Sequence, residues 1–250
     1  HVEIRLVKRM RDISAVAPGP VPAWAQGVAF PELGVVVVAR FGERGAVLDT
    51  NKTLAHELAH LALGRALSGG DPARTGRVPR WLTEGFAYVH SADFSFARTT
   101  TLMGAAFSRS LIPLAQLDAA FPAREDEAEL AYAESYDFVA HLAERGRWAD
   151  SDDDGDRSAF LVFLAELGAG NSVDASAQVG FGMPLAELEK EWLASLSKRY
   201  FWVPIVAFSS LIWVLGALLL VLGWWRRKRG AHKTLQRWAR EEDAANDAPE

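Results

Sequence analysis

Two histidines and a glutamate have a spacing that suits metal-activated hydrolysis. His56-Glu57-Leu58-Ala59-His60 follows the pattern His-Glu-x-x-His. Residues four apart lie on one face of a helix, so both imidazoles reach one metal ion. Glu57 is offset by one position and reaches a water molecule on that ion. We therefore predict that His56 and His60 bind one metal ion and that Glu57 contacts a water molecule on it.

A catalytic zinc site usually has three protein ligands and one open position. The third ligand is expected to be a histidine or a carboxylate on a nearby element. Glu84 is the only carboxylate in the apolar run from Trp81 to Val89. The chain between His60 and Glu84 is long enough for a loop and an antiparallel return. We predict that Glu84 is the third metal ligand.

The two motifs together carry a family resemblance. His-Glu-x-x-His followed by Trp-Leu-x-Glu-Gly-x-Ala (residues 81–87) resembles the gluzincin branch of zinc metallopeptidases. More closely, it resembles the bacterial peptidase MA-like domains, which are relatives of the membrane alanyl aminopeptidases. The segments 22–31, 131–142 and 182–196 are also similar to that family. The resemblance implies a zincin-like catalytic domain that hydrolyses peptide or protein substrates, with His56, His60 and Glu84 on zinc and Glu57 as the base.

The resemblance also implies a residue that stabilises the oxyanion. In the aminopeptidase relatives a tyrosine does this at the first position of Tyr-x-x-Ser-x-x-Phe, which matches Tyr132 here. A hydroxyl aimed at developing negative charge is an effective electrostatic stabiliser. Tyr136 lies one turn later on the same helix face, so the sequence leaves both tyrosines open.

The chain departs from its relatives at two places. The aminopeptidases hold the substrate's amino end with a Gly-Ala-Met-Glu-Asn segment, where this chain has residues 27–32, GVAFPE. Endopeptidase and aminopeptidase activity therefore both stay open. Thermolysin-like relatives have an aspartate four residues after the glutamate ligand, and Tyr88 occupies that place here.

The elements that must position these residues follow from periodicity and breakers. Alternation predicts a strand over 2–8, the run of valines predicts a buried strand over 33–39, and a short return strand is expected at 46–48. Helices are predicted over 50–67, 79–91, 126–145, 157–168 and 184–199. The prediction is an α+β fold, with a small strand region followed by a mainly helical catalytic domain. The family resemblance also implies that residues 35–39 of this strand run beside the cleft and pair with an extended substrate.

An apolar segment near the end predicts one transmembrane helix. No charge occurs from Phe201 to Trp225, and a bilayer span needs roughly 20 apolar helical residues. Aromatic residues flank both ends, and a basic cluster, Arg226 to Arg229, follows directly. The positive-inside rule then places residues 226–250 in the cytoplasm, as a disordered tail, and residues 1–200 outside the cell membrane. The first residue is His1 rather than Met, which favours a removed signal peptide.

Composition excludes several other classes of function. The absence of Cys excludes a disulfide scaffold, a cysteine-based zinc finger and a thiol nucleophile. A net charge of −5 gives no general attraction to nucleic acid, so no nucleic-acid partner is expected. The segment 150–156 begins like a calcium loop, but Leu161 stands where the bidentate glutamate belongs, so we interpret it as a solvated acidic loop. The alternative function is a catalytically silent, zinc-stabilised binding or scaffold module at the membrane.

Overall fold

The computed structural model describes residues 1–68, 78–91, 95–118, 121, 124–148, 158–201 and 213–228. The chain divides into two compact units, His1–Lys198 and Arg199–Glu250. The first unit holds every residue that the sequence places at the metal site.

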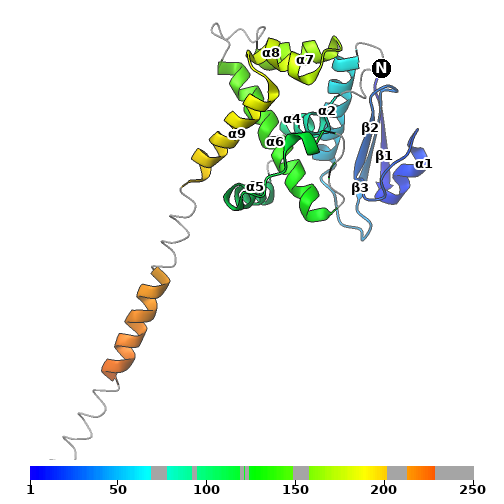
Figure 1. Ribbon diagram of the computed structural model, residues 1–250. Coiled ribbons are helices and arrows are strands. Elements are labelled where there is room, and N and C mark those ends of the chain that lie inside the picture. Colours follow the sequence, from blue (N-terminus) through cyan, green and yellow to red (C-terminus); the bar gives the residue numbers. More distant parts are fainter. Residues whose placement is uncertain are drawn as a thin grey trace, which may run out of the picture. The chain divides into compact units, whose positions relative to one another are not determined.

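A three-stranded sheet forms one side of the first unit (Figure 1). Its strands are β1 (Glu3–Arg9), β2 (Gly27–Phe30) and β3 (Val35–Phe41), in the order β1-β3-β2. β1 runs parallel to β3 and β2 antiparallel to it. Residues 35–39 of β3 are buried because one face packs on Ile13 of α1 (Ile13–Val16) and the other on Leu61 of the long helix that follows the sheet. This central position explains the continuous run of valines.

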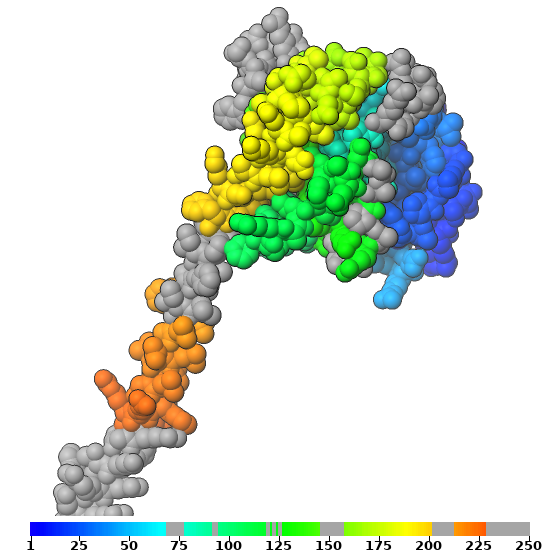
Figure 2. Space-filling model, in the orientation of Figure 1, coloured from blue at the N-terminus to red at the C-terminus, as the bar shows by residue number. Residues whose placement is uncertain are grey.

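The rest of the unit is mostly helical, and the strands lie at one side of it (Figures 1 and 2). Their order is α2 (Thr50–Ser68), α4 (Arg80–His90), α5 (Phe96–Ser108), α6 (Glu125–Trp148), α7 (Ala159–Gly168), α8 (Val173–Phe181) and α9 (Leu185–Tyr200). Short 3₁₀ turns, η1 (Met10–Asp12) and η2 (Leu114–Gln116), join some of these elements. The mainly helical α+β architecture confirms the predicted fold class.

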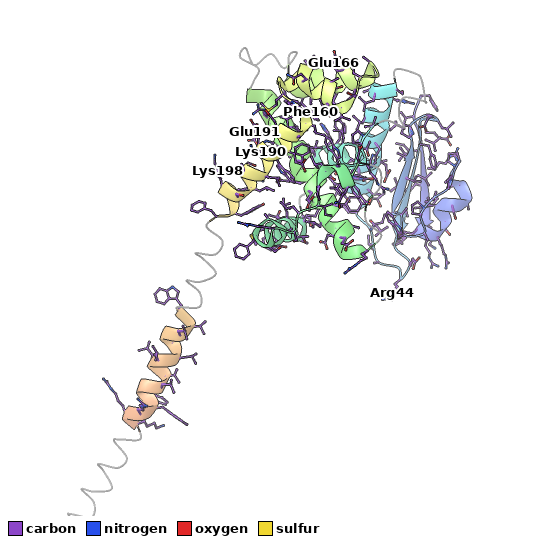
Figure 3. All side chains as sticks on the ribbon, viewed as in Figure 1. Arg44, Phe160, Glu166, Lys190, Glu191 and Lys198 are labelled. Atoms are coloured by element: carbon purple, nitrogen blue, oxygen red, sulfur yellow. The ribbon has the colours of Figure 1, made fainter. Side chains whose placement is uncertain are left out.

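An aromatic cluster fixes α4, α6 and α9 to one another. The ring of Phe138 on α6 lies 5.0 Å from that of Trp81 and 5.3 Å from that of Trp192, and all three side chains are buried. The indole of Trp192 also donates to buried Asp137 at 2.7 Å. Along the outside of α9, where Figure 3 labels Lys190, Glu191 and Lys198, Glu191 pairs with Arg145 of α6 at 2.7 Å.

The first turn of α4 is capped by backbone from a distant segment. Pro79 at the N-cap has no side chain that could accept a hydrogen bond, so the first N–H groups of the helix need other acceptors. The N–H groups of Arg80 and Trp81 donate to the carbonyls of Asp118 and Leu117 at 3.0 and 3.3 Å. The segment that carries these two carbonyls is itself anchored to α6, because the N–H of Ile112 donates to buried Glu134 at 2.9 Å. This arrangement fixes where α4 begins and how its side chains point.

The structure differs from the predicted elements in several places. The sequence pattern does not predict α1, β2, α5 or α8, and the expected strand at 46–48 is only an isolated bridge between Phe41 and Val47. The expectation that the strand over 33–39 pairs with substrate is wrong, because β3 lies between β1 and β2 and both of its edges are already paired. The strand on the cleft side is β2. β2 runs only from Gly27 to Phe30, in a stretch flanked by prolines. Four residues are too few for an alternation of apolar and polar side chains to be recognised in the sequence.

The second unit is helical over residues 213–228. Within the described parts of the chain, no helix is long and apolar enough to cross a membrane. Of the predicted span 201–225, residues 202–212 lie outside the described residues, as does most of the predicted tail. The acidic loop at 150–156 also lies outside them.

Candidate metal centre

Two helices bring the three predicted ligands together. The Nε2 atoms of His56 and His60 on α2 lie 3.1 Å apart. Glu84 on α4 points its Oε2 at both rings, 3.8 Å from Nε2 of His56 and 3.7 Å from Nε2 of His60. The ligand atoms of the three residues all lie within 4.8 Å of one another. The sequence-based grouping of these side chains is therefore matched by their geometry.

The donor set and its spacing fit a zinc ion. Tetrahedral zinc at about 2.0–2.1 Å from each ligand places ligand atoms roughly 3.3 Å apart, close to the separations seen here. Burial lowers the pKa of His60 to about 3, with smaller contributions from His56 and Arg80. A neutral imidazole is the form that binds a metal ion, so His60 needs no proton removed. Two imidazoles and one carboxylate leave a fourth position for water or substrate.

The predicted base lies one residue along from the first ligand and is buried. Glu57 is 8% exposed on the sheet side of α2. Burial and, to a smaller extent, the charge of Glu84 raise the pKa of Glu57 to about 8, against the opposing effect of a hydrogen bond from the backbone N–H of Ala29. A bound cation lowers the pKa of a nearby carboxyl, so the ionised form is favoured once metal is present. A base with a pKa near the working pH is well matched to proton transfer.

A glycine on β2 leaves room for that base. A Cβ at Gly27 would lie 2.7 Å from Cγ2 of Thr53 and 2.9 Å from Cγ of Glu57. Only glycine therefore lets β2 approach α2 so closely at this level. The strand backbone then passes beside Glu57, and Ala29 is in place to donate to it.

A second glycine sets the distance between α4 and α6. A Cβ at Gly85 would overlap the carbonyl oxygen of Ser135 and the side chain of Val139. The two helices consequently touch backbone to backbone next to Glu84. This contact brings Tyr132, one turn before Ser135 on α6, to the metal site.

Tyr132 and Tyr136 occupy different surroundings. Tyr132 lines the same cavity as the metal ligands and hydrogen-bonds Arg80. Burial and the charge of Glu84 raise the pKa of Tyr132, and Arg80 opposes the shift. Tyr136 is not among the described residues that line the cavity, and its ring lies 5.9 Å from the guanidinium of Arg98. Of the two tyrosines left open by the sequence, Tyr132 has the position that suits an oxyanion donor.

Tyr88, which stands where thermolysin-like relatives have aspartate, packs against a ligand. Its ring meets that of His56 edge to face at 4.5 Å, and the guanidinium carbon of Arg98 on α5 lies 4.3 Å from the centre of the Tyr88 ring. The imidazole of His56 is thus held by aromatic packing as well as by its own helix.

The centre lies in an open cavity of about 1060 Å³. Its walls come from β2, α2, α4 and α6 and from the segments beside them. The polar side chains in the wall are Gln26, Glu32, Asp49, Lys52, Thr53, His56, Glu57, His60, Arg80, Thr83, Glu84, Tyr88, Asp118 and Tyr132. A space of this size accommodates several residues of an extended peptide.

Sequence reasoning missed Arg80 and the β2 backbone as members of the site. Arg80 lies four residues before Glu84, so the two share a helix face, and its Nε lies 3.6 Å from Oε1 of Glu84. That spacing is a signal the sequence contains. The role of β2 is carried by backbone groups, which leave little trace in residue type.

A sequence model of one family matches most of the chain. The family is described as Peptidase MA superfamily, and residues 15–198 are matched. The match covers β2, β3 and every helix of the first unit from α2 to α9. Neither the curated proteins nor the solved structures include a significant match.

Proposed function

Because the chain belongs to the Peptidase MA superfamily, we propose that it is a zinc-dependent metallopeptidase of the gluzincin type. The family supports a metallopeptidase-like activity in general. The proposal of a zinc-dependent gluzincin rests on one observation: His56, His60 and Glu84 lie together in a cavity that also contains Glu57. Two histidines, a carboxylate ligand and a separate carboxylate base are the groups that zinc-assisted amide hydrolysis needs.

Each residue has one task in the proposed reaction. His56, His60 and Glu84 would hold the zinc ion, which when bound would lower the pKa of a water molecule and polarise the scissile carbonyl. Glu57 accepts a proton from the attacking water and passes it to the leaving amine. The N–H of Ala29 keeps the carboxylate of Glu57 oriented. Tyr132 donates its hydroxyl hydrogen to the oxyanion that develops on the carbonyl oxygen.

The free edge of β2 is the proposed place for an extended substrate. The N–H of Ala39 donates to the carbonyl of Gln26, and the pairing continues with Val28 opposite Val37. Backbone groups alternate along a strand, so those of Gly27 and Ala29 point away from β3. The N–H of Ala29 is engaged by Glu57, so the groups proposed to pair with substrate are the N–H of Gly27 and the carbonyls of Gly27 and Ala29. A peptide lying along this edge adds a strand to the sheet and brings a scissile bond over the metal site. Strand pairing of this kind recognises the main chain of the substrate, which all peptides share, rather than particular side chains.

Metal analysis together with a peptide-library cleavage assay tests the proposed function. We expect the purified chain to contain about one zinc per molecule and to cleave members of the library, with cleavage lost on chelation and restored by added zinc. Metal bound without cleavage of any peptide would favour the alternative, a silent zinc-stabilised module. A chain without stoichiometric metal would contradict both.

We also propose that residues 201–225 anchor the catalytic unit to the cell membrane, with the C-terminal side in the cytoplasm. Basic residues directly after the segment, Arg226 to Arg229, outnumber Lys198 and Arg199 before it. Moving a basic side chain across hydrocarbon costs about 2.5–3.5 kcal/mol on insertion scales, which favours this orientation.

Protease treatment of spheroplasts checks this topology. We expect added protease to digest the unit His1–Lys198 and to spare an epitope placed after Glu250. Protection of the unit with loss of the epitope would reverse the orientation, and recovery of the whole chain in the soluble fraction would contradict the anchor.

A further inference from the structure

Arg80 contacts both a proposed metal ligand and the proposed oxyanion residue. Its Nε lies 3.6 Å from Oε1 of Glu84, and its guanidinium hydrogen-bonds the hydroxyl of Tyr132. The side chain of Arg80 is 41% exposed and forms part of the cavity wall. No task in the reaction described above belongs to it.

Three contacts fix Arg80 in this place, one through its backbone and two through its guanidinium. The backbone N–H of Arg80 is anchored on the carbonyl of Asp118 at 3.0 Å. Its guanidinium carbon lies 5.0 Å from the centre of the Phe121 ring, and that ring packs edge to face on Tyr132 at 4.8 Å. Oxygen Oε1 of Glu84 supplies the third contact, while Oε2 faces the two imidazoles. The ion pair with Glu84 therefore holds Arg80 without using the oxygen that faces the metal position.

The chemistry of the two groups determines the direction of the hydrogen bond. A guanidinium has only donors, so the oxygen of Tyr132 must accept from Arg80. Because Arg80 donates to the oxygen of Tyr132, the hydrogen of the hydroxyl remains available for donation to another group. A cation bonded to the oxygen also polarises the O–H bond and strengthens it as a donor. Tyr132 is thereby prepared to donate toward a group in the cavity.

We propose that Arg80 is a positioning residue that makes Tyr132 a donor to the oxyanion. The inference rests on the proposed peptidase function and adds a residue to it. Arg80 acts through Tyr132, not on the substrate, and its contact with Glu84 serves to hold it in place. Its effect is therefore confined to the step in which negative charge develops on the carbonyl oxygen.

A double-mutant cycle on the full chain tests this coupling. The variants are Arg80→Met, Tyr132→Phe and both together, with Arg80→Lys as a variant that keeps the charge. Arg145→Met is the matched control, because Arg145 is also a helix arginine in an ion pair, with Glu191, and it lies outside the cavity wall. For each variant we would measure zinc content, the thermal midpoint, kcat and KM on a peptide cleaved by the parent chain.

We expect Arg80→Met to keep its zinc and lower kcat about 10–100-fold with little change in KM, the size of effect found for residues that orient reacting groups. In the Tyr132→Phe background the same change should lower kcat less than about 3-fold, because the residue through which Arg80 acts is gone. Arg80→Lys should fall between the parent and Arg80→Met, since a lysine gives a point charge without the rigid fork. If Arg80→Met does not fold, the cycle is run with Arg80→Lys and the same non-additivity is expected.

Three outcomes would overturn the proposal. Equal losses in both backgrounds would mean that Arg80 does not act through Tyr132. If Arg80→Met raised KM for peptides with a free C-terminus but not for C-terminally amidated peptides, Arg80 would instead bind the substrate carboxylate. Loss of zinc from Arg80→Met would make it a support for Glu84. Absence of cleavage by the parent and by Arg145→Met would instead contradict the proposed function itself, and the role of Arg80 with it.

Discussion

Replacing Glu57 with Gln is expected to reduce peptide hydrolysis by about 10²–10⁴-fold while the zinc stays bound, because the amide cannot accept a proton from the attacking water. Gln keeps the size of the side chain and an oxygen that can still accept from the N–H of Ala29. Glu57 is not one of the three proposed ligands, so metal content should be unchanged. The measurement is kcat and KM on one library peptide, with zinc determined on the same sample.

Glu134→Gln is the matched control for this experiment. Glu134 is also buried, burial raises its pKa to about 8 as well, and its carboxyl accepts from a backbone N–H, yet it does not line the cavity. We expect that variant to cleave at the parental rate. An equal loss of activity in Glu134→Gln and Glu57→Gln would mean that any buried carboxyl is needed, and parental activity in Glu57→Gln would remove Glu57 from the mechanism.

The stability of the metal-free chain provides a second test of Glu57→Gln. The pKa of Glu57 in the folded chain lies above the usual value of 4.5. The unfolded chain therefore releases this proton at lower pH than the folded chain, and the parent loses stability as the pH rises from about 4.5 to about 8. Gln has no such proton, so metal-free Glu57→Gln should unfold at a higher temperature than the metal-free parent at pH 8. The difference should vanish near pH 4.

The sequence could predict which side chains come together at the site because they stand in recognisable helical patterns. His56 and His60 are four apart on one helix, and Glu84 is isolated among apolar residues on the next predicted helix. Such patterns require only local geometry, and α2 and α4 begin and end close to the predicted boundaries. The placement of α4 against α6 depends on the contact of Gly85 with Ser135, which no local pattern contains.

The parts that could not be predicted are those defined by distant backbone contacts. β2 is four residues long and is recognisable as a strand only through its pairing with β3. The valine-rich strand is not the substrate edge, because its hydrophobicity reflects burial on both faces and not proximity to the cleft. In the same way, the capping of α4 by the carbonyls of Leu117 and Asp118 involves no side-chain motif.

Replacing His60 with Ala is expected to remove the metal. His60 supplies one of two Nε2 atoms 3.1 Å apart, and the remaining pair, His56 and Glu84, leaves the ion with two ligands. Losing a direct ligand should weaken zinc binding by more than the 10–100-fold typical of outer-shell residues. Zinc content should fall from about one per chain to near zero after dialysis against a weak chelator. His90→Ala is the matched control, because His90 lies at the end of α4 outside the cavity wall and should leave zinc content unchanged.

Thermal unfolding separates loss of the ligand from loss of the fold. A metal that binds only the folded chain stabilises it by about 4 kcal/mol at a concentration 1,000 times its dissociation constant, so added zinc should raise the thermal midpoint of the parent. For His60→Ala the same addition should have no effect, because no native site of comparable affinity remains. The metal-free midpoint of the variant should stay near that of the metal-free parent, since His60 is a partly buried, uncharged imidazole and its removal leaves no charge without a partner. Full zinc content in His60→Ala, or a parental response to added zinc, would show that the ion is held by other groups and would remove the two-helix centre from the proposed mechanism.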